Sequence, residues 1–445
     1  MPLIRRVRRR TVIATALALM FAGATSVLTP TPAVVAQPAT HRSHAAEATA
    51  EVISDDAVYQ SRRTQGGGVY DPESRTTYVV WNAGAMDIYL RGYDHHARTW
   101  GKPVLIAEWG NTGTWAYHDY AVLTLLPNGH LAIYASHHVQ DVVQFVAPTP
   151  HSLEGTWTRS TVTTDLAAYP EPVVVGDTVH LFYSRNDDQA WPYRTYKVIT
   201  SSDNGASWSG PRNIIDTGRT DDLFNQVYVK SADAIGDRAC LTWTLAGGPG
   251  GHNAESQNLY GACFDPTTAR MQTLAGASLG ATVDAGDLAA VLLLEAPTST
   301  AAKHPVPLAS LAEDPRTGRI IVGVGVTIDG VGTVRAGWAA DDGIEWTTVV
   351  ESSSRFRDMT WSRNGVEILS LGRATPTVRA DHVSPHHVKN LWEIEIPYGD
   401  SGADTAYTAT YVENRSTISA VLSTIDESER TKDYTGSWPV VALFD

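Results

Sequence analysis

The feature that most constrains the fold of this chain is a repeating pattern of short alternating strands, in units of roughly fifty to sixty residues. The strands are rich in Val, Ile, Tyr, Thr and Trp, and Gly, Asp, Asn or Pro turns separate them, whereas helical periodicity is nearly absent. Several units end in a turn followed by Trp, at 93–100, 151–157, 201–208 and 340–346. Repeats of about four strands each predict small sheets arranged radially around an axis.

The sharpest of these endings is Ser201-Ser-Asp-Asn-Gly-Ala-Ser-Trp208. It resembles the Asp-box of sialidase-type propeller blades, in which Asp and Gly close a tight turn and Trp packs between neighbouring blades. The motif is a folding device and carries no catalytic information. We therefore predict an all-β fold, a single β-propeller over residues 56–445, with seven blades of four-stranded antiparallel sheets.

The repeat supports five to seven blades, and seven is the number we predict. A pair of β-sandwiches is the alternative fold, but it leaves the Trp-terminated units unexplained. The predicted blades lie near residues 66–108, 118–164, 168–216, 222–274, 305–352 and 355–397, and the last combines 405–445 with a strand near 56–64.

The first 36 residues predict an export signal. Residues 1–10 carry five arginines, residues 11–21 form an apolar run, and small residues suited to a signal peptidase follow. The apolar run is too short to span a membrane. Residues 37–55 are rich in Ala, Thr, Pro and His, which predicts a disordered linker. We therefore expect a secreted protein that has no membrane contact after signal cleavage.

The charge of the chain argues against binding to nucleic acid. Five of the 34 Lys and Arg residues lie in the first ten positions, which leaves 29 against 48 acids and a net charge of −19. Nucleic-acid binding needs a basic surface. The negative net charge of the chain is still compatible with an anionic ligand that binds in a locally positive cleft.

Cys240 and Cys263 are the only two cysteines, and each lies in a predicted strand beside a Gly-rich loop. The midpoint of the two positions falls in that loop, so the sulfur atoms can be cross-strand neighbours. In an oxidising compartment this predicts a structural disulfide, and two independent buried thiols are the alternative.

Two consecutive predicted hairpins place reactive side chains at their open ends. His118 and His138 are centred on the Pro127-Asn-Gly turn, so both imidazoles lie opposite each other. Tyr169 and Arg185 are centred in the same way on the next turn, at Gly176-Asp177. A base, an acid and an anion-binding group can therefore meet at one place.

This part of the chain resembles the BNR-4-type propellers, which include ulvan lyases and related polysaccharide lyases. The resemblance covers roughly residues 66–275, and no family signature follows from about residue 276 onward. The resemblance rests on six short sequence segments. They are His118-Asp-Tyr with the run to His138, Tyr169-Pro170, Leu181–Arg185, the Asp-box, Gln226–Lys230 and Asn258–Tyr260.

The resemblance implies roles for these residues. His118 corresponds to the base that abstracts a proton, Tyr169 to the acid, and Arg185 to the residue that neutralises a uronate carboxylate. His138 and Tyr228 are implied as supporting residues of the subsite. Arg185 departs from the family pattern because it follows Tyr-Ser, and Arg194 or Lys197 are candidates to share its role. Tyr228, Arg194 and Trp191 complete the predicted substrate-binding set.

These residue types suit β-elimination on chemical grounds as well. The C5 proton of a 4-linked uronate is weakly acidic, and pairing the neighbouring carboxylate with a guanidinium stabilises the resulting anion. A neutral His is a suitable base, and a Tyr hydroxyl can protonate the departing O4. The chemistry requires no cofactor and no catalytic metal, and a structural metal ion is compatible with the sequence.

Two other function classes remain open. A propeller glycoside hydrolase, such as a sialidase, needs carboxylates at the rim, but no early Arg-Ile-Pro motif precedes the repeats. The candidate acids are Asp119, Glu171, Asp187, Asp188, Asp221 and Asp222. A non-catalytic carbohydrate-binding propeller would stack Trp115, Trp191 and the rim tyrosines on sugars. We predict the lyase, as a monomer that acts on an anionic polysaccharide.

Overall fold

The computed structural model describes residues 48–58, 66–188, 193–218, 224–340, 343–351, 354–362, 365–372, 377–395, 405–414, 416–426 and 438–445. These residues belong to one compact unit, Ala46–Asp445. The predicted export signal at residues 1–36 lies outside the described residues. No helix in the described ranges is long and apolar enough to cross a membrane.

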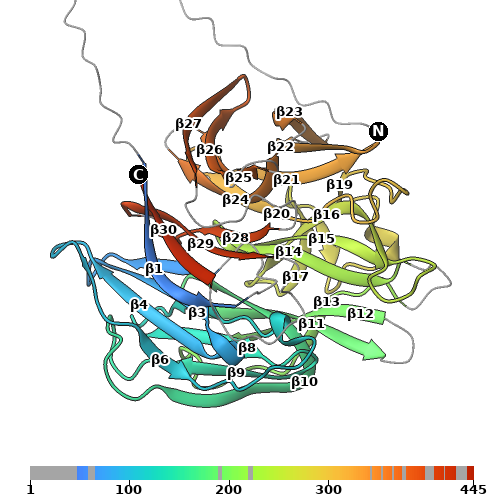
Figure 1. Cartoon of the computed structure of the whole chain (residues 1–445). Helices are drawn as coiled ribbons and strands as arrows, with labels where there is room; N and C mark the ends of the chain where they lie inside the picture. Colours follow the sequence, from blue (N-terminus) through green and yellow to red (C-terminus); the bar gives the residue numbers. More distant parts are fainter. Residues whose placement is uncertain are drawn as a thin grey trace, which may run out of the picture. The chain divides into compact units, whose positions relative to one another are not determined.

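The all-β prediction is confirmed, because the described elements are strands and short 3-10 helices (Figure 1). The helices are η1 (Gly84–Met86), η2 (Ala116–His118) and η3 (Ala285–Asp287). The first sheet has the order β2-β3-β4-β5, and β6 also pairs with β4. Its strands are β2 (Gly68–Asp71), β3 (Thr76–Asn82), β4 (Ile88–Asp94), β5 (Thr99–Trp100) and β6 (Val104–Ala107).

The largest sheet joins three consecutive groups of strands into one hydrogen-bonded path. Strand β10 (Thr158–Val175) belongs to two groups, because its first part pairs with β9 and its second part with β11. The other strands of this sheet are β7 (Val122–Leu125), β8 (Leu131–Ser136), β9 (Gln140–Val146), β11 (Thr178–Asp188), β12 (Tyr193–Ser201), β13 (Arg212–Ile215), β14 (Gln226–Ile235), β15 (Arg238–Gly247), β16 (Glu255–Asp265), β17 (Arg270–Thr273), β18 (Ser278–Gly280) and β19 (Leu292–Leu294).

Three four-stranded antiparallel sheets follow. The first two contain β20 (Ala309–Asp314), β21 (Arg319–Ile328), β22 (Val331–Ala340) and β23 (Gly343–Glu351), and then β24 (Ser354–Ser362), β25 (Gly365–Gly372), β26 (Thr377–Ser384) and β27 (His387–Glu395). The last has the order β1-β30-β29-β28 and so joins both ends of the unit. Its strands are β1 (Thr49–Ala57), β28 (Thr405–Tyr411), β29 (Ile418–Asp426) and β30 (Trp438–Phe444).

Strand β1 corrects the predicted linker at 37–55 and the predicted closing strand near 56–64. The strand that completes the last sheet begins at Thr49, within the segment expected to be disordered. It lies at the sheet edge, where only Ile53 and Ala57 of its nine residues are buried. An edge strand with one exposed face tolerates the polar composition that suggested a linker.

The first strands of consecutive groups contact one another along the chain. Backbone hydrogen bonds join the segment after β28 to β2, where Glu413 N donates to the Gly68 carbonyl over 3.0 Å. Neighbouring strands within a group run in opposite directions. The start of each first strand therefore lies beside the end of the second strand and the start of the third, at one edge of the molecule. We call this edge the rim. It includes the segments before β7, β14, β20 and β24, the turns β8–β9, β11–β12, β15–β16 and β21–β22, and the bulge in β10.

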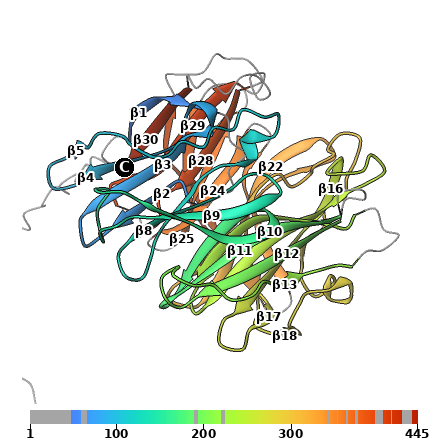
Figure 2. The ribbon, with the colours of Figure 1, turned by 90° about the horizontal axis from the view of Figure 1, so that it is seen from below.

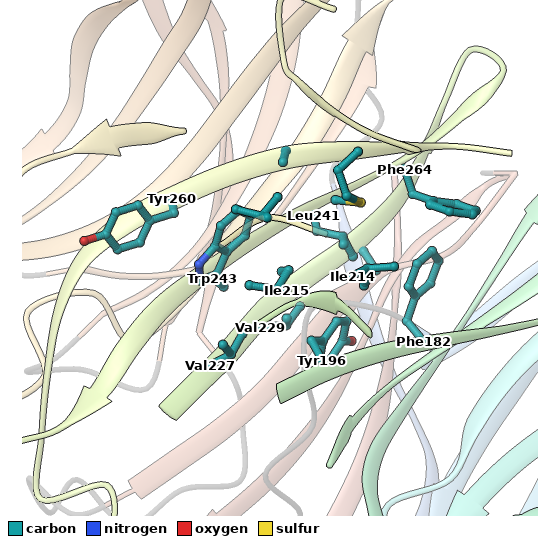
Figure 3. Close-up of a cluster of buried hydrophobic side chains, with 14 of the residues drawn as sticks. Phe182, Tyr196, Ile214, Ile215, Val227, Val229, Leu241, Trp243, Tyr260 and Phe264 are labelled. Carbon is teal, nitrogen blue, oxygen red and sulfur yellow. The ribbon is translucent and has the colours of Figure 1, made fainter. Parts of the chain in front are cut away.

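Hydrophobic clusters fill the spaces between neighbouring groups, and the largest lies over β10 to β17 (Figure 3). Phe182, Trp243 and Phe264 are among its buried aromatic residues. Trp208 of the Asp-box packs against the next cluster and contacts Tyr134 edge-on, with ring centroids 6.0 Å apart. This packing matches the role that the motif predicted for its Trp.

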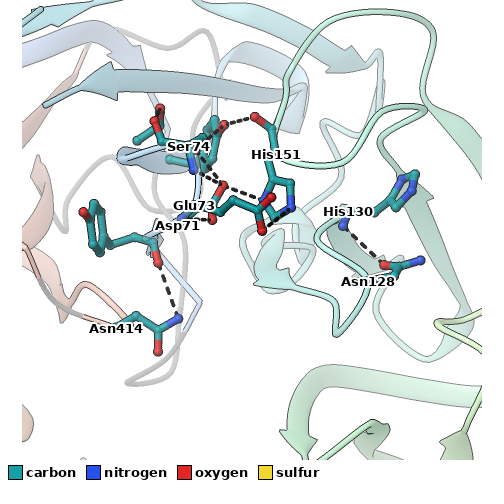
Figure 4. A network of polar contacts seen from close by, with 10 residues as sticks. Asp71, Glu73, Ser74, Asn128, His130, His151 and Asn414 are labelled. Carbon is teal, nitrogen blue, oxygen red and sulfur yellow. Dashed lines mark hydrogen bonds and ion pairs between the residues drawn. The ribbon is translucent and has the colours of Figure 1, made fainter. Parts of the chain in front are cut away.

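A polar network ties the β2–β3 turn to the segment after β9 (Figure 4). The buried Asp71 accepts hydrogen bonds from Ser74 Oγ at 2.6 Å and His151 Nδ1 at 2.9 Å. Tyr78 donates its hydroxyl to the His151 carbonyl at 2.8 Å. Burial opposes ionisation of Asp71, but these hydrogen bonds hold its pKa below the usual value. The network therefore fixes the first group against the second by charge-assisted hydrogen bonds.

The predicted disulfide is confirmed. Cys240 of β15 lies directly opposite Cys263 of β16, and a bond joins their sulfur atoms. Both residues are fully buried, within the cluster between β15–β16 and β20–β21.

We expect the double variant Cys240→Ala/Cys263→Ala to lose about 3 kcal/mol of unfolding free energy, because the bond closes a loop of moderate length in the unfolded chain. Urea denaturation measures this loss. Wild-type protein compared with and without reductant isolates the cross-link from the lost sulfur packing. A loss well under about 1 kcal/mol in both comparisons would contradict the expectation.

Candidate active site

The structure brings His118, His138 and Tyr169 together at the rim. His118 ends η2 just before β7, and His138 lies in the turn between β8 and β9. Their imidazole rings stack with centroids 4.6 Å apart. The Tyr169 hydroxyl lies 3.0 Å from His118 Nδ1. Three of the four residues predicted at the two hairpin mouths therefore lie in one cluster, whereas Arg185 pairs across the strands with Ala167 rather than with Tyr169.

Tyr169 owes its position to a bulge in β10. The pairing of β10 with β11 shifts register between Ala168 and Glu171, and Tyr169 has φ of 58°. A non-glycine residue in the left-handed region is strained, and such strain persists where the surrounding structure enforces it. A bulge re-aims a side chain out of the regular alternation. Here it coincides with the contact between Tyr169 and His118.

A buried arginine lies behind two tyrosine rings of this cluster. The guanidinium of Arg194, on β12, sits 4.6 Å from the ring centroid of Tyr228 and 5.6 Å from that of Tyr169. Arg194 is 1% exposed, and its Nε donates to Asn186 Oδ1 at 2.7 Å. Its Nη1 and Nη2 atoms have no hydrogen-bond partner among the described residues. A buried guanidinium in this state is costly, which points to a functional reason for keeping it.

Arg194, which was predicted to bind substrate, is buried in this structure. A side chain that is 1% exposed beneath two aromatic rings does not offer its donors to a ligand in this conformation. Its positive charge nevertheless reaches the cluster, since it lowers the pKa of both His138 and His252.

Arg185 lies in a different set of contacts. It donates Nε to Asp165, which also accepts from Lys197 Nζ at 2.9 Å and from the Tyr183 hydroxyl at 3.0 Å. Arg185 and Asn186 are consecutive on β11, so their side chains leave opposite faces of the strand. The Arg185 side chain is 25% exposed. It is thus an accessible cation, held in place by Asp165.

His252 is a member of the cluster that the sequence left unassigned. It lies in the turn between β15 and β16, and its Nε2 is 3.2 Å from the Tyr228 hydroxyl. Burial first, and then the charge of Arg194, lower the pKa of His252 to about 4. Burial and Arg194 lower the pKa of His138 to about 4 as well, although Asp119 opposes them. Both imidazoles are therefore neutral near pH 7.

Asp119 holds the backbone of the turn that carries His138, and it directly follows His118 in the chain. It is fully buried and accepts hydrogen bonds from His137 Nδ1 and from the backbone N of His138, both at 2.9 Å. Trp109 Nε1 and Asn111 Nδ2 also donate to it, at 2.9 and 2.6 Å. The carboxylate of Asp119 therefore ties the segment after His118 to the turn that carries His138. The His-Asp-Tyr run in the sequence was the available signal for this role.

The carboxylates considered for a hydrolase do not form a catalytic pair in the described part of the chain. Both oxygens of Asp119 accept hydrogen bonds from the groups just named. Glu171 is buried and accepts from the Tyr196 hydroxyl at 3.1 Å. The remaining candidates lie outside what the structure describes, namely the side chains of Asp187 and Asp188, and residues Asp221 and Asp222. Trp191, predicted to bind substrate, also lies there.

Within the described ranges, no three His, Cys, Asp or Glu side chains gather as a metal-ligand set. This includes the neighbourhood of His382, where Asp381 forms an ion pair with Arg379.

The lowered pKa values of His138 and His252 predict how stability depends on pH. Between about pH 4 and the ordinary histidine value of 6.5, the folded protein binds fewer protons than the unfolded chain. Their contribution is therefore fully present above about pH 6.5 and is lost as the pH falls through this window. Urea midpoints of the wild type should decline more steeply from pH 7 to pH 4.5 than those of His138→Gln/His252→Gln. Parallel declines would contradict these assignments.

No protein-family model and no curated protein sequence matches this chain. Solved structures do match its fold. An ulvan lyase of polysaccharide lyase family PL25, bound to -[GlcA(1-4)Rha3S]-, aligns with a TM-score of 0.67 and 13% identity, over 87% of this chain and 94% of that chain. The polysaccharide lyase Uly1 aligns with a TM-score of 0.58 and 10% identity, over 88% of this chain and 92% of that chain. At these identities the likeness establishes the fold, which is that of β-propeller lyases.

Proposed function

We propose that this protein is a secreted polysaccharide lyase with a seven-bladed β-propeller. It cleaves a uronate-containing anionic glycan, ulvan-like or with another rhamnose–glucuronate linkage, by β-elimination. The observation that carries the proposal is the 3.0 Å contact between the Tyr169 hydroxyl and His118 Nδ1, at a strained bulge beside a buried cation. Seven groups of strands, the last completed by β1, support the blade number. The signal-like residues 1–36 support secretion.

The contact between His118 and Tyr169 suits a base and an acid that act in one elimination. When His118 Nδ1 donates to the Tyr169 oxygen, Nε2 is unprotonated and accepts the C5 proton of the uronate. The C4–O4 bond then breaks, a double bond forms between C4 and C5, and the departing O4 takes the phenolic proton of Tyr169. The imidazolium returns its Nδ1 proton to the tyrosinate, which leaves the proton from C5 on Nε2. Exchange of this proton with water and return of a proton to Nδ1 restore the starting tautomer of His118. His138, stacked on His118, holds the base in orientation.

Two arginines supply positive charge in different ways. Arg185 is accessible and oriented by Asp165, so it is suited to pair with the substrate carboxylate and stabilise the charge that develops after proton removal. Arg194 lies against the face of the Tyr169 ring and stabilises negative charge on its oxygen. Tyr228, which shares the Arg194 contact and meets His252, lines the neighbouring subsite.

A screen of anionic polysaccharides tests this function. The purified secreted form should produce unsaturated uronate ends, followed by ultraviolet absorbance and mass spectrometry, on an ulvan-like or rhamnose–glucuronate polymer. Sulfated polymers without uronate serve as controls, because they have no C5 proton beside a carboxylate. Reducing-sugar release without unsaturated product would select a hydrolase, and saturable binding without turnover would select a binding protein. Either of these two results would contradict the proposed lyase activity.

A further inference from the structure

A polar pocket lies on the rim, apart from the cluster of His118, His138 and Tyr169. It has a volume of about 280 Å³ and lies between the β20–β23 sheet and the start of β24. Its polar walls come from Arg355 and Arg357 of β24, His304 before β20, and the hydroxyl-bearing Thr327 and Thr333. The side of β21 that faces it carries glycine, and a Cβ at Gly325 would lie 2.9 Å from Phe356 Cβ. This close approach places the start of β24 against the end of β21.

The β15–β16 turn and the start of β16 lie between the candidate active site and this pocket. The β15–β16 turn carries His252, which meets Tyr228, and β16 begins just beyond it. Ser256 of β16 lies 3.2 Å from His304 Nδ1 through its Oγ, and its backbone N donates to the Lys303 carbonyl at 2.8 Å. A chain of sugars that leaves the Tyr228 subsite along the rim would therefore reach His304.

The charged side chains that line this pocket are arginines, although the protein as a whole is acidic. Arg355, which lines the pocket, makes no ion pair with any described residue. A further arginine lies next to the lining, since Arg335 donates its Nε to Oγ1 of the lining residue Thr333 at 3.2 Å. Burial first, and then Lys230 and Lys303, hold the pKa of His304 below its ordinary value against the opposing charge of Glu255. The acid within β24, Asp358, is already engaged by Ser310 Oγ at 3.0 Å and by the backbone N of Tyr411 at 2.8 Å.

We propose that this pocket is a remote subsite for an anionic group of the polysaccharide, a sulfate ester or a uronate carboxylate, several sugars away from the scissile bond. Arg355 provides the main contact, because guanidinium donors match the geometry of both oxyanions. The size suits the anionic face of one sugar ring. This inference rests on the proposed function only for the identity of the ligand as a polysaccharide.

The test compares Arg355→Gln with the wild type on long and short substrates of the same glycan. On the long polymer KM should rise about tenfold, as expected for a lost charge-assisted contact, whereas oligosaccharides too short to span both sites should be cleaved as before. Arg316→Gln is the control, because it removes an equal charge at the β20–β21 turn, which lies at the opposite edge of the neighbouring β20–β23 sheet. Arg355→Lys should recover part of the affinity.

Binding is measured in parallel with His118→Ala, in which elimination is blocked. A sulfated polymer, its desulfated form and a neutral polymer distinguish the two anions from general adhesion. Equal effects of Arg355→Gln on long and short substrates, or none on either, would overturn the subsite. Arg355-dependent binding by a protein that shows no lyase activity would overturn the proposed function and leave the subsite standing.

Discussion

Replacing Tyr169 with Phe should lower kcat by about 10²- to 10⁴-fold on the cleaved polymer, with little change in KM. The ring would still pack on Arg194, so the fold and the bulge are retained. Only the hydroxyl that meets His118 and protonates O4 would be lost. Stopped-time assays of unsaturated product, with thermal melts to check folding, measure this effect.

His118→Ala should cause a loss of the same size, because the two groups act as one unit. The double variant should therefore be little worse than either single variant. Tyr228→Phe is the matched control, since it removes a rim hydroxyl that lies 3.2 Å from His252 Nε2. We expect it to cost about tenfold at most. A Tyr169→Phe enzyme as active as the Tyr228→Phe enzyme would rule out Tyr169 as the acid.

The second large effect should follow from Arg194→Met. We expect kcat to fall by about 10²- to 10³-fold, because the variant loses a fixed positive charge behind the Tyr169 ring. The free energy of unfolding should rise by about 1 kcal/mol, because an apolar side chain replaces a buried guanidinium whose Nη atoms lack partners among the described residues. Activity and stability should therefore change in opposite directions.

Histidine titration followed by NMR separates this electrostatic role from a structural one. Without Arg194, the pKa values of His138 and His252 should both rise, since its charge contributes to their depression. Arg185→Met is the matched comparison and should raise KM, because this arginine is placed to bind carboxylate. Loss of stability in Arg194→Met with unchanged histidine titration would show that Arg194 only supports the fold.

The strand pattern predicted the all-β class, and symmetry about the first turn predicted that His118 lies beside His138. Symmetry about the second turn wrongly placed Tyr169 opposite Arg185, because a bulge shifts the register there. The spacing of His118 and His138 around one turn depends only on hairpin geometry, which sequence records well. The cysteine pair followed from the same argument. These inferences needed no knowledge of how the sheets pack.

The features of the site that could not be predicted from the sequence depend on contacts between strands and between sheets. Alternation along β11 and β12 decides that Arg194 faces Tyr228 while Arg185 faces Asp165, and a one-residue bulge at Tyr169 sets the phenol position. His252 lies in a Gly-rich turn without periodicity, so nothing local distinguished it. The edge strand β1 was missed because only two of its residues are buried.

The pairing of β1 with β30 has a consequence for how the protein reaches its working form. The first strand to emerge from synthesis must wait for the last strand of the chain before its backbone groups find their partners. Contacts of such large sequence separation form slowly, because the ends of a long loop must meet. The propeller therefore remains open until β30 is available to pair with β1, so removal of β30 should leave the last sheet without its central partner for β1.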